Sequence, residues 1–167
     1  MKHKEGKNMK KKLVGIGIII LGAMIYLAGC TSTTQNDDNT NKNTNYNATP
    51  QQNATEVRIP LSDIGTTATF YSYDSDGVTV RYFVVKDTQG TIHVAFDACD
   101  VCYEAKKGYK QNGEVMQCLN CGQTFAITDI GIENTGGGCW PSFLPMNIDG
   151  NDVIIKIVDL EAKSYMF

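Results

Sequence analysis

Five cysteines in the second half of the chain have the type and spacing to do chemistry. Cys99 and Cys102 form one Cys-x2-Cys pair, and Cys118 and Cys121 form another after fifteen intervening residues. In such a turn the two sulfurs converge and backbone N–H groups point at them, so two turns can place four thiolates in a tetrahedron. The spacing falls within the four-cysteine zinc pattern. We therefore predict that Cys99, Cys102, Cys118 and Cys121 bind a metal ion or a cluster.

The fifth cysteine, Cys139, follows a run of three glycines, Gly136 to Gly138, which lets the backbone approach another surface closely. Cys139 is a possible additional ligand or redox thiol beside the site, and the alternative is a remote surface thiol. The alternative for the two pairs is a disulfide in each, although a bridge across two residues is more often labile than structural.

The N-terminus has the organisation of an export signal. Residues 1–12 hold six lysines against one glutamate, and residues 13–27 form an uncharged apolar run. That run is too short for a comfortable bilayer span but suits the central region of a signal peptide. It ends in Leu27-Ala28-Gly29-Cys30, which resembles the lipobox of prokaryotic lipoproteins. The resemblance implies that residues 1–29 are removed and that Cys30 is lipidated, and the alternative is an uncleaved anchor with an incidental cysteine.

We expect residues 30–56 to be the lipidated cysteine followed by a disordered tether, because this tract is rich in Asn, Thr and Gln and has almost no aliphatic side chain to bury. The folded domain is then 57–167. The chain carries a net charge of −3 despite its basic N-terminus, so the body is acidic, which argues against a nucleic-acid partner. Export places this domain on the outer face of the cytoplasmic membrane.

The domain shows short alternating stretches separated by turn residues, and no helical period of ten residues or more. We predict a mainly β fold, a small antiparallel sheet or sandwich with the Cys-x2-Cys turns on loops at one end. The predicted strands are 57–61, 67–73, 78–86, 91–97, 114–117, 124–128 and 151–160. His93 alternates with the apolar Ile92 and Val94, so we expect it at the surface of its strand.

The segment Cys118-Leu119-Asn120-Cys121-Gly122, with Phe125 and Gly131 after it, resembles the second ligand box of Rieske iron–sulfur domains. Cys121 stands where the Rieske histidine would be, and His93 is the only histidine of the folded domain. A Rieske centre with two histidine ligands is therefore excluded. The likeness implies a Rieske-like or rubredoxin-like scaffold carrying four thiolates.

A closer resemblance is to the FtrD-like family of membrane iron–sulfur proteins. It rests on F-D-A-C-D-V-C-Y (96–103), K-G-Y (107–109), C-L-N-C-G (118–122) and G-G-G-C-W-P (136–141). The resemblance implies metal binding and electron transfer linked to iron transport. Its implied partners are a membrane permease or a redox protein, in addition to the membrane itself through the lipid anchor.

The cofactor and the function class stay open at this point. The resemblance favours an iron–sulfur cluster. Zinc is the alternative and copper a further one, because both ions can bind after export and suit thiolate ligands. The first function is a membrane-anchored carrier of electrons or metal. The others are a β binding module with a structural zinc site and a thiol–disulfide redox protein. No nucleophile–base set or acidic pair indicates a hydrolytic enzyme, so no catalytic residue is predicted.

Overall fold

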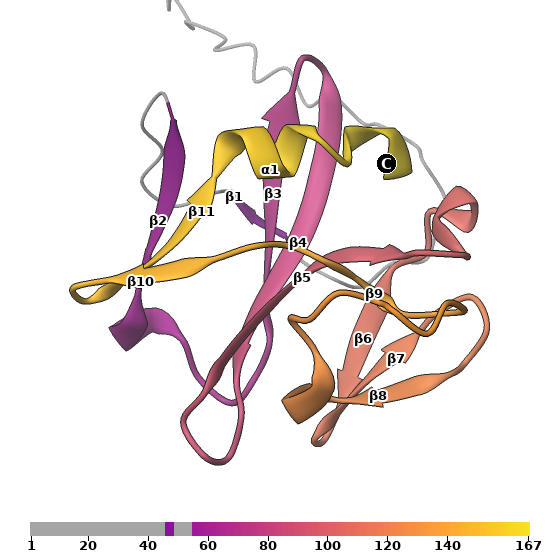
Figure 1. The fold of residues 1–167 in the computed structure, drawn as a ribbon, viewed down its shortest axis with the longest axis horizontal. Coiled ribbons are helices and arrows are strands. Elements are labelled where there is room, and N and C mark those ends of the chain that lie inside the picture. Colours follow the sequence, from indigo (N-terminus) through magenta and orange to yellow (C-terminus); the bar gives the residue numbers. More distant parts are fainter. Residues whose placement is uncertain (1–45, 49–54) are drawn as a thin grey trace, which may run out of the picture. The chain divides into compact units, whose positions relative to one another are not determined.

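The computed structural model describes residues 46–48 and 55–167, and most of its elements are strands (Figure 1). The predicted signal peptide, Cys30 and most of the tether lie outside the described residues. No helix within the described part is long and apolar enough to cross a membrane. The strands are β1 (Asn47–Ala48), β2 (Glu56–Pro60), β3 (Thr69–Ser75), β4 (Val78–Lys86), β5 (Ile92–Cys99), β6 (Tyr109–Asn112), β7 (Val115–Cys118), β8 (Thr124–Ala126), β9 (Pro141–Phe143), β10 (Asn147–Asp149) and β11 (Asp152–Lys156). One short α-helix, α1 (Ile157–Glu161), follows β11, and single 3-10 turns cover Leu61–Asp63, Tyr103–Ala105, Ile127–Asp129 and Ser164–Met166.

The strands form three sheets. A five-stranded sheet has the order β1-β3-β4-β5-β9, a second has the order β10-β11-β2, and a third is the meander β6-β7-β8. Every pair of neighbours is antiparallel except β1 and β3, which are parallel. The prediction of a mainly β fold with small antiparallel sheets is confirmed.

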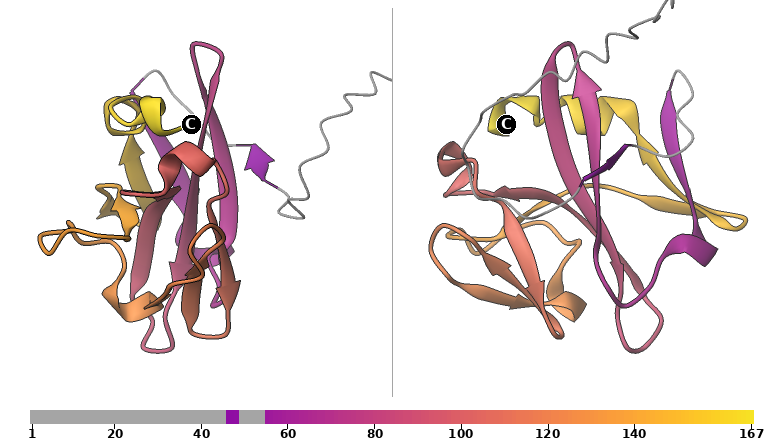
Figure 2. Two further views of the ribbon diagram at one scale, coloured as in Figure 1. Left: turned by 90° about the vertical axis from the view of Figure 1, so that its right-hand side faces the viewer. Right: turned by 180° about the vertical axis from the view of Figure 1, so that it is seen from behind.

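The five-stranded sheet is covered on both faces. Along β4, Val80, Tyr82 and Val84 belong to a core shared with β2 and β11, whereas Phe83 and Val85 belong to a core shared with β6, β7 and β8. This division follows the two-residue period of a strand. Figure 2 shows in side view that α1 and β11 lie on one side of β3 and β4. The cysteine-bearing meander thus packs on the opposite face from β2 and β11.

His93 is buried, and the prediction that it lies at the surface is wrong. It does face opposite Ile92 and Val94, but β5 runs between two cores, so neither face meets solvent. Its Nδ1 lies 2.9 Å from the carbonyl oxygen of Ile130 and its Nε2 lies 3.0 Å from Oδ2 of Asp87. The ring therefore joins the β4–β5 turn to the segment after β8.

Several predicted boundaries differ from the structure. Strands β6, β9 and β10 are not among the predicted ones, and the predicted strand at 124–128 ends at Ala126. The predicted strand at 151–160 ends at Lys156, which pairs with Glu56 at the first residue of β2. One more backbone hydrogen bond follows, from Ile157 N to the carbonyl oxygen of Thr55 at 3.0 Å, and the chain then turns into α1. Ile157 and Leu160 are then buried at a helical spacing of three residues.

Parts of the predicted tether belong to the fold, namely residues 46–48 and also 55–56, where β2 begins. Asn47 and Ala48 form β1 and pair with Tyr71 and Ser72 of β3. Tyr46 packs its ring edge-on against Phe70 at a centroid distance of 5.9 Å. At these residues the expectation of a disordered tether differs from the structure, because a composition rule averages over a tract and misses one aromatic anchor.

A buried carboxylate fixes the meander to the five-stranded sheet. Asp97 of β5 is fully buried, and its Oδ1 accepts a hydrogen bond from the backbone N–H of Tyr109 at 2.6 Å. Gly108 lies against it with a φ of +66°, and a Cβ there would lie 2.3 Å from each carboxylate oxygen. Arg81 Nε, 3.4 Å from Asp97 Oδ2, and the Tyr46 hydroxyl are further partners of this carboxylate. The F-D-A-C and K-G-Y sequences are therefore two halves of one contact.

We expect Gly108→Ala to destabilise the protein strongly, because alanine would combine a left-handed backbone with a direct clash against Asp97. Gly113→Ala is the matched control, since Gly113 also has a positive φ, +62°, but nothing within 4 Å of the added Cβ. The control should cost about 1–2 kcal/mol of unfolding free energy and Gly108→Ala on the order of 3–5 kcal/mol. Chemical denaturation of both variants measures the difference, and equal losses would contradict the role given to Asp97.

The Asp87 carboxylate predicts an acid dependence of stability. The hydrogen bond with His93 lowers the pKa of Asp87, and the backbone N–H groups of Gln89 and Thr91 act in the same direction. A lowered folded-state pKa contributes stability above the unfolded pKa of about 4, and this is lost as the pH falls through the folded value. Asp87→Asn should therefore be less stable than wild type near pH 7, and the gap should shrink below pH 4. Asp76→Asn, in an exposed turn, should show no such convergence when unfolding is measured across this range.

Candidate metal centre

The first Cys-x2-Cys turn begins at the last residue of β5. Cys99 is buried there and Cys102 is half-buried. The backbone N–H groups of Val101 and Cys102 donate to the sulfur of Cys99. The turn is held to the glycine-rich segment because Asp100 N donates to the carbonyl oxygen of Trp140 at 3.0 Å. The sequence prediction that backbone N–H groups point at the sulfurs is confirmed for this turn.

The second turn follows β7 and has the same construction. The backbone N–H groups of Asn120 and Cys121 donate to the sulfur of Cys118. The N–H of Gln123 donates to the sulfur of Cys121, across Gly122, whose φ is +77°. Cys121 is therefore held by the backbone in the manner expected of a ligand, even though its side chain is exposed.

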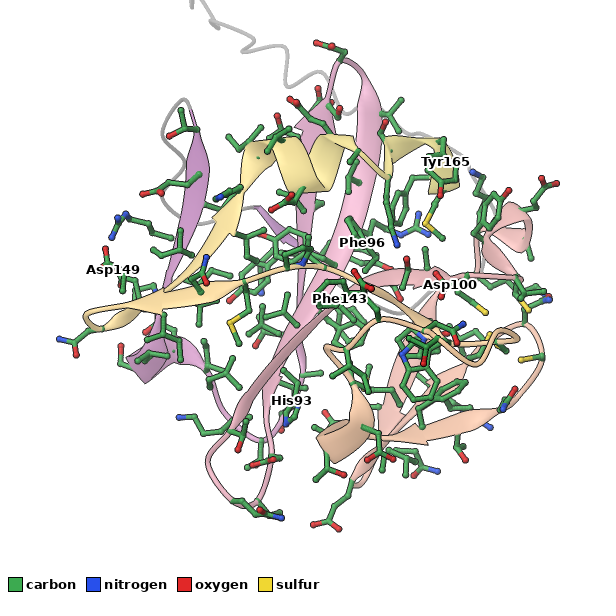
Figure 3. The ribbon with its side chains drawn as sticks, viewed as in Figure 1. His93, Phe96, Asp100, Phe143, Asp149 and Tyr165 are labelled. Carbon is green, nitrogen blue, oxygen red and sulfur yellow. The ribbon has the colours of Figure 1, made fainter. Side chains whose placement is uncertain are left out.

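Pairing between β5, β6 and β7 brings the two turns together. Tyr109, whose N–H binds Asp97, lies opposite Cys118 in the β6–β7 ladder. Leu119 N then donates to the carbonyl oxygen of Gly108 at 2.9 Å. Cys139 lies beside the first turn because Pro141, two residues after it at the start of β9, pairs with Cys99. Figure 3 shows sulfur atoms gathered near Asp100, where β5 ends beside the meander.

Four of the five sulfurs converge, and the fifth, that of the predicted ligand Cys121, lies beside them in contact with Cys139. Those of Cys99, Cys102, Cys118 and Cys139 lie within 4.8 Å of one another. Cys139 Sγ is 2.8 Å from Cys99 Sγ and 3.2 Å from Cys121 Sγ. None of these five cysteines is in a disulfide. The structure thus places Cys139 among the sulfurs themselves, next to the predicted ligand Cys121, rather than at a remote surface position.

The thiols differ in how readily they ionise. Burial raises the pKa of Cys99, but the Cys139 thiol and the backbone N–H groups of its own turn lower it to about 7. The N–H of Gln123 lowers the pKa of Cys121. Burial and the contacts with Cys99 and Cys121 raise the pKa of Cys139. The raised pKa of Cys139 favours its protonated form, and this thiol lies between two sulfurs whose pKa values are lowered.

An aromatic wall shields the sulfurs on one side. Phe125 packs edge-on against Trp140 at 5.2 Å between ring centroids and against Tyr109 at 6.1 Å. These three rings share one cluster with the cysteines, whereas Phe96 and Tyr103 belong to the other core. The sequence analysis did not separate the two groups, because only the tertiary structure shows which face of the central sheet each ring covers.

Two buried donors lie in this wall without a hydrogen-bond partner among the described residues, the hydroxyl of Tyr109 and Nε1 of Trp140. Buried polar groups are usually paired, so an orphaned donor indicates an acceptor supplied by something bound. Five thiol groups are soft ligands that suit zinc, copper(I) or an iron–sulfur cluster. Sulfur ligands accept hydrogen bonds, so the residues present fit a thiolate-held metal centre.

Sequence reasoning missed two residues that support this site. Arg81 and Tyr46 both bind the Asp97 carboxylate, and the Arg81 guanidinium also lies over the Tyr46 ring, 5.6 Å from its centroid. Tyr46 is the only aromatic residue of the tract 31–55, which was the available signal. No feature of the sequence indicated Arg81, because a basic residue within a strand ordinarily faces solvent.

The comparison with protein families agrees with the geometry. Residues 64–167 match the family described as membrane iron-sulfur containing protein FtrD-like. No curated protein and no solved structure matches the chain. The matched segment contains all five cysteines of the site, Asp97, Gly108 and Tyr109, and it covers more than half of the chain. The chain therefore belongs to the FtrD-like family of membrane iron–sulfur proteins.

Proposed function

We propose that the protein is a membrane-anchored, extracytoplasmic electron carrier or metal-handling protein that holds an iron–sulfur cluster at the five cysteines of this site. The observation that carries the proposal is the meeting of the two Cys-x2-Cys turns. Three of their sulfurs, those of Cys99, Cys102 and Cys118, lie within 4.8 Å of one another and of Cys139, and the fourth, that of Cys121, lies 3.2 Å from Cys139. When bound, such a cluster takes up and releases single electrons. The family description supports the iron–sulfur form.

The four proposed ligands are Cys99, Cys102, Cys118 and Cys121. Either Cys121 or Cys139 could be the fourth ligand. The distances between sulfurs favour Cys139, because its sulfur lies within 4.8 Å of those of Cys99, Cys102 and Cys118. Backbone support favours Cys121, because the N–H of Gln123 donates to its sulfur. The contacts found around the Cys139 sulfur are with the thiols of Cys99 and Cys121. We assign Cys139 as an additional thiol in contact with two ligands.

The chain's other residues do three things at this site. Backbone N–H groups of both turns stabilise negative charge on sulfur, which favours thiolates and sets the potential of what they hold. Phe125 and Trp140 exclude water from one side. Cys121 and Val101 are exposed, so an edge of the site faces solvent, where a partner can exchange electrons.

A single zinc ion is the second candidate, and one observation favours it. Four sulfurs around zinc are about 3.8 Å apart for a bond length of about 2.3 Å. The sulfurs of Cys99, Cys102, Cys118 and Cys139, with Cys139 in the fourth place, come close to that spacing because they lie within 4.8 Å of one another. The protein would then be a β binding module with a structural metal. The purified protein separates the two, because an iron–sulfur cluster contains iron and acid-labile sulfide and absorbs visible light.

The ligand assignment predicts a pattern among single variants. Serine at Cys99, Cys102, Cys118 or Cys121 should reduce metal content and lower the melting temperature together, because a thiolate site contributes folding free energy, on the order of 10 kcal/mol for zinc. Cys139→Ser should retain the metal and change its absorption spectrum. Iron, zinc and sulfide analysis with thermal melting tests all five. Loss of metal in Cys139→Ser with retention in Cys121→Ser would reverse the assignment of the fourth ligand.

We further propose that a lipid on Cys30 anchors the domain to the outer face of the cytoplasmic membrane, where a permease of iron transport or a redox protein is the partner. The basic, apolar and small-residue segments at 1–30 support the anchor. The family is described as a membrane family, which supports the location.

Cys30→Ser should block lipidation, so the precursor should accumulate or the protein should leave the membrane. Fractionation with metabolic labelling by a radioactive fatty acid measures both. Cys139→Ser, the matched control, should keep the label. Unchanged labelling and membrane retention in Cys30→Ser would contradict the anchor and leave the metal site unaffected.

A further inference from the structure

The protein groups around Tyr109 do not explain why a hydroxyl is present at this position. Tyr109 is fully buried, and its oxygen has no hydrogen-bond partner of ordinary geometry among the described residues. A buried hydroxyl left unpaired destabilises the folded state, whereas phenylalanine would fill the same space without an unpaired polar atom. The oxygen therefore indicates an acceptor that is present when the site is loaded.

The Tyr109 side chain shares its core with the cysteines of the site. The Tyr109 hydroxyl lies close enough to Cys99 Sγ for each group to perturb the pKa of the other, and the sulfurs of Cys118 and Cys139 also act on it. A phenol hydroxyl is protonated at neutral pH, so it can donate a hydrogen bond to a thiolate. Of the three, Cys99 is the sulfur with which it interacts most strongly.

The position of Tyr109 is fixed from both sides, which makes such a contact reproducible. Its backbone N–H is held by Asp97, and its ring packs between Phe83, at a centroid distance of 6.3 Å, and Phe125. Gly108, the residue before Tyr109, has no side chain that would block the approach of the Asp97 carboxylate. The hydroxyl is thus aimed by a buried hydrogen bond and two rings, as expected of a group whose direction matters.

We propose that Tyr109 is a potential-tuning residue whose hydroxyl donates a hydrogen bond to the Cys99 thiolate of the bound metal centre. The inference rests on the proposed function only in requiring a thiolate-held metal. Reduction adds one electron to the centre and increases negative charge on its sulfur ligands. A hydrogen bond to a ligand sulfur therefore stabilises the reduced form more than the oxidised form and raises the potential.

Tyr109→Phe in the full-length protein tests the bond by removing one oxygen atom. The variant should keep its iron and acid-labile sulfide, but its midpoint potential should fall. We expect about a tenfold lower ratio of reduced to oxidised centres at the wild-type midpoint, which corresponds to about 59 mV for one electron. Dye-mediated redox titration followed by visible absorption measures this.

Tyr82→Phe is the matched control. Tyr82 is equally buried, but it lies in the other core, where it stacks on Tyr71 at 5.4 Å between ring centroids. Loss of its hydroxyl should alter stability and leave the potential unchanged. An unchanged potential in Tyr109→Phe, or an equal shift in both variants, would overturn the proposal.

A second measurement does not require the variant to fold. Ring-fluorinated tyrosine makes the phenol a stronger donor, so its incorporation should raise the potential of the wild type and of Tyr82→Phe alike. An unchanged potential in both would contradict a hydrogen bond from Tyr109.

Cobalt(II) separates failure of this inference from failure of the proposed function. If purified protein contains no acid-labile sulfide, the iron–sulfur assignment is wrong. The cobalt-loaded protein still reports on the bond, because the thiolate-to-cobalt charge-transfer band should move to lower energy in Tyr109→Phe and stay in place in Tyr82→Phe. Coincident bands in wild type and Tyr109→Phe would reject the hydrogen bond whatever the native metal is.

Discussion

The contact between the Asp97 carboxylate and the Tyr109 N–H connects the parts of this protein that must act together. Asp97 is fully buried, and it lies two residues before the first ligand turn. Through Tyr109 it fixes β6, and β6 carries β7, whose last residue is Cys118. A buried carboxylate is costly unless it is paired and hydrogen-bonded, so its partners must keep their places. The alignment of the two cysteine turns follows from that requirement.

Electrostatics then limits what the cysteines can be. Five sulfurs in one place cannot all ionise without a cation, because like charges at such distances repel in a poorly solvated site. The five thiols therefore differ in how well the protein stabilises negative charge on them. Backbone N–H groups stabilise negative charge on Cys99, Cys118 and Cys121, whereas burial and the neighbouring thiols raise the pKa of Cys139. A bound cation relieves the repulsion that remains, which couples metal binding to the stability of this end of the fold.

The two faces of the central sheet pack against two different cores. One face packs on β2 and β11 in an apolar core that needs no metal. The other face carries Asp97 and Cys99 against the meander, and its core includes cysteines among its buried residues. Metal loss should therefore loosen the second core first. The aromatic rings of that core also keep water from one side of the sulfurs, which strengthens every hydrogen bond made to them.

The sequence by itself determined the chemistry and the class of fold. Two Cys-x2-Cys pairs predict converging thiolates because the turn geometry is local, and alternation with turn residues predicts antiparallel strands for the same reason. Long-range facts needed the tertiary structure. Alternation gave the correct face for His93, but only the second core shows that this face is buried. The position of Cys139 depends on the pairing of β9 with β5, and the docking of Tyr46 depends on a carboxylate that lies far along the chain. Sequence spacing cannot report such contacts, because they form between segments whose separation along the chain carries no information about distance in space.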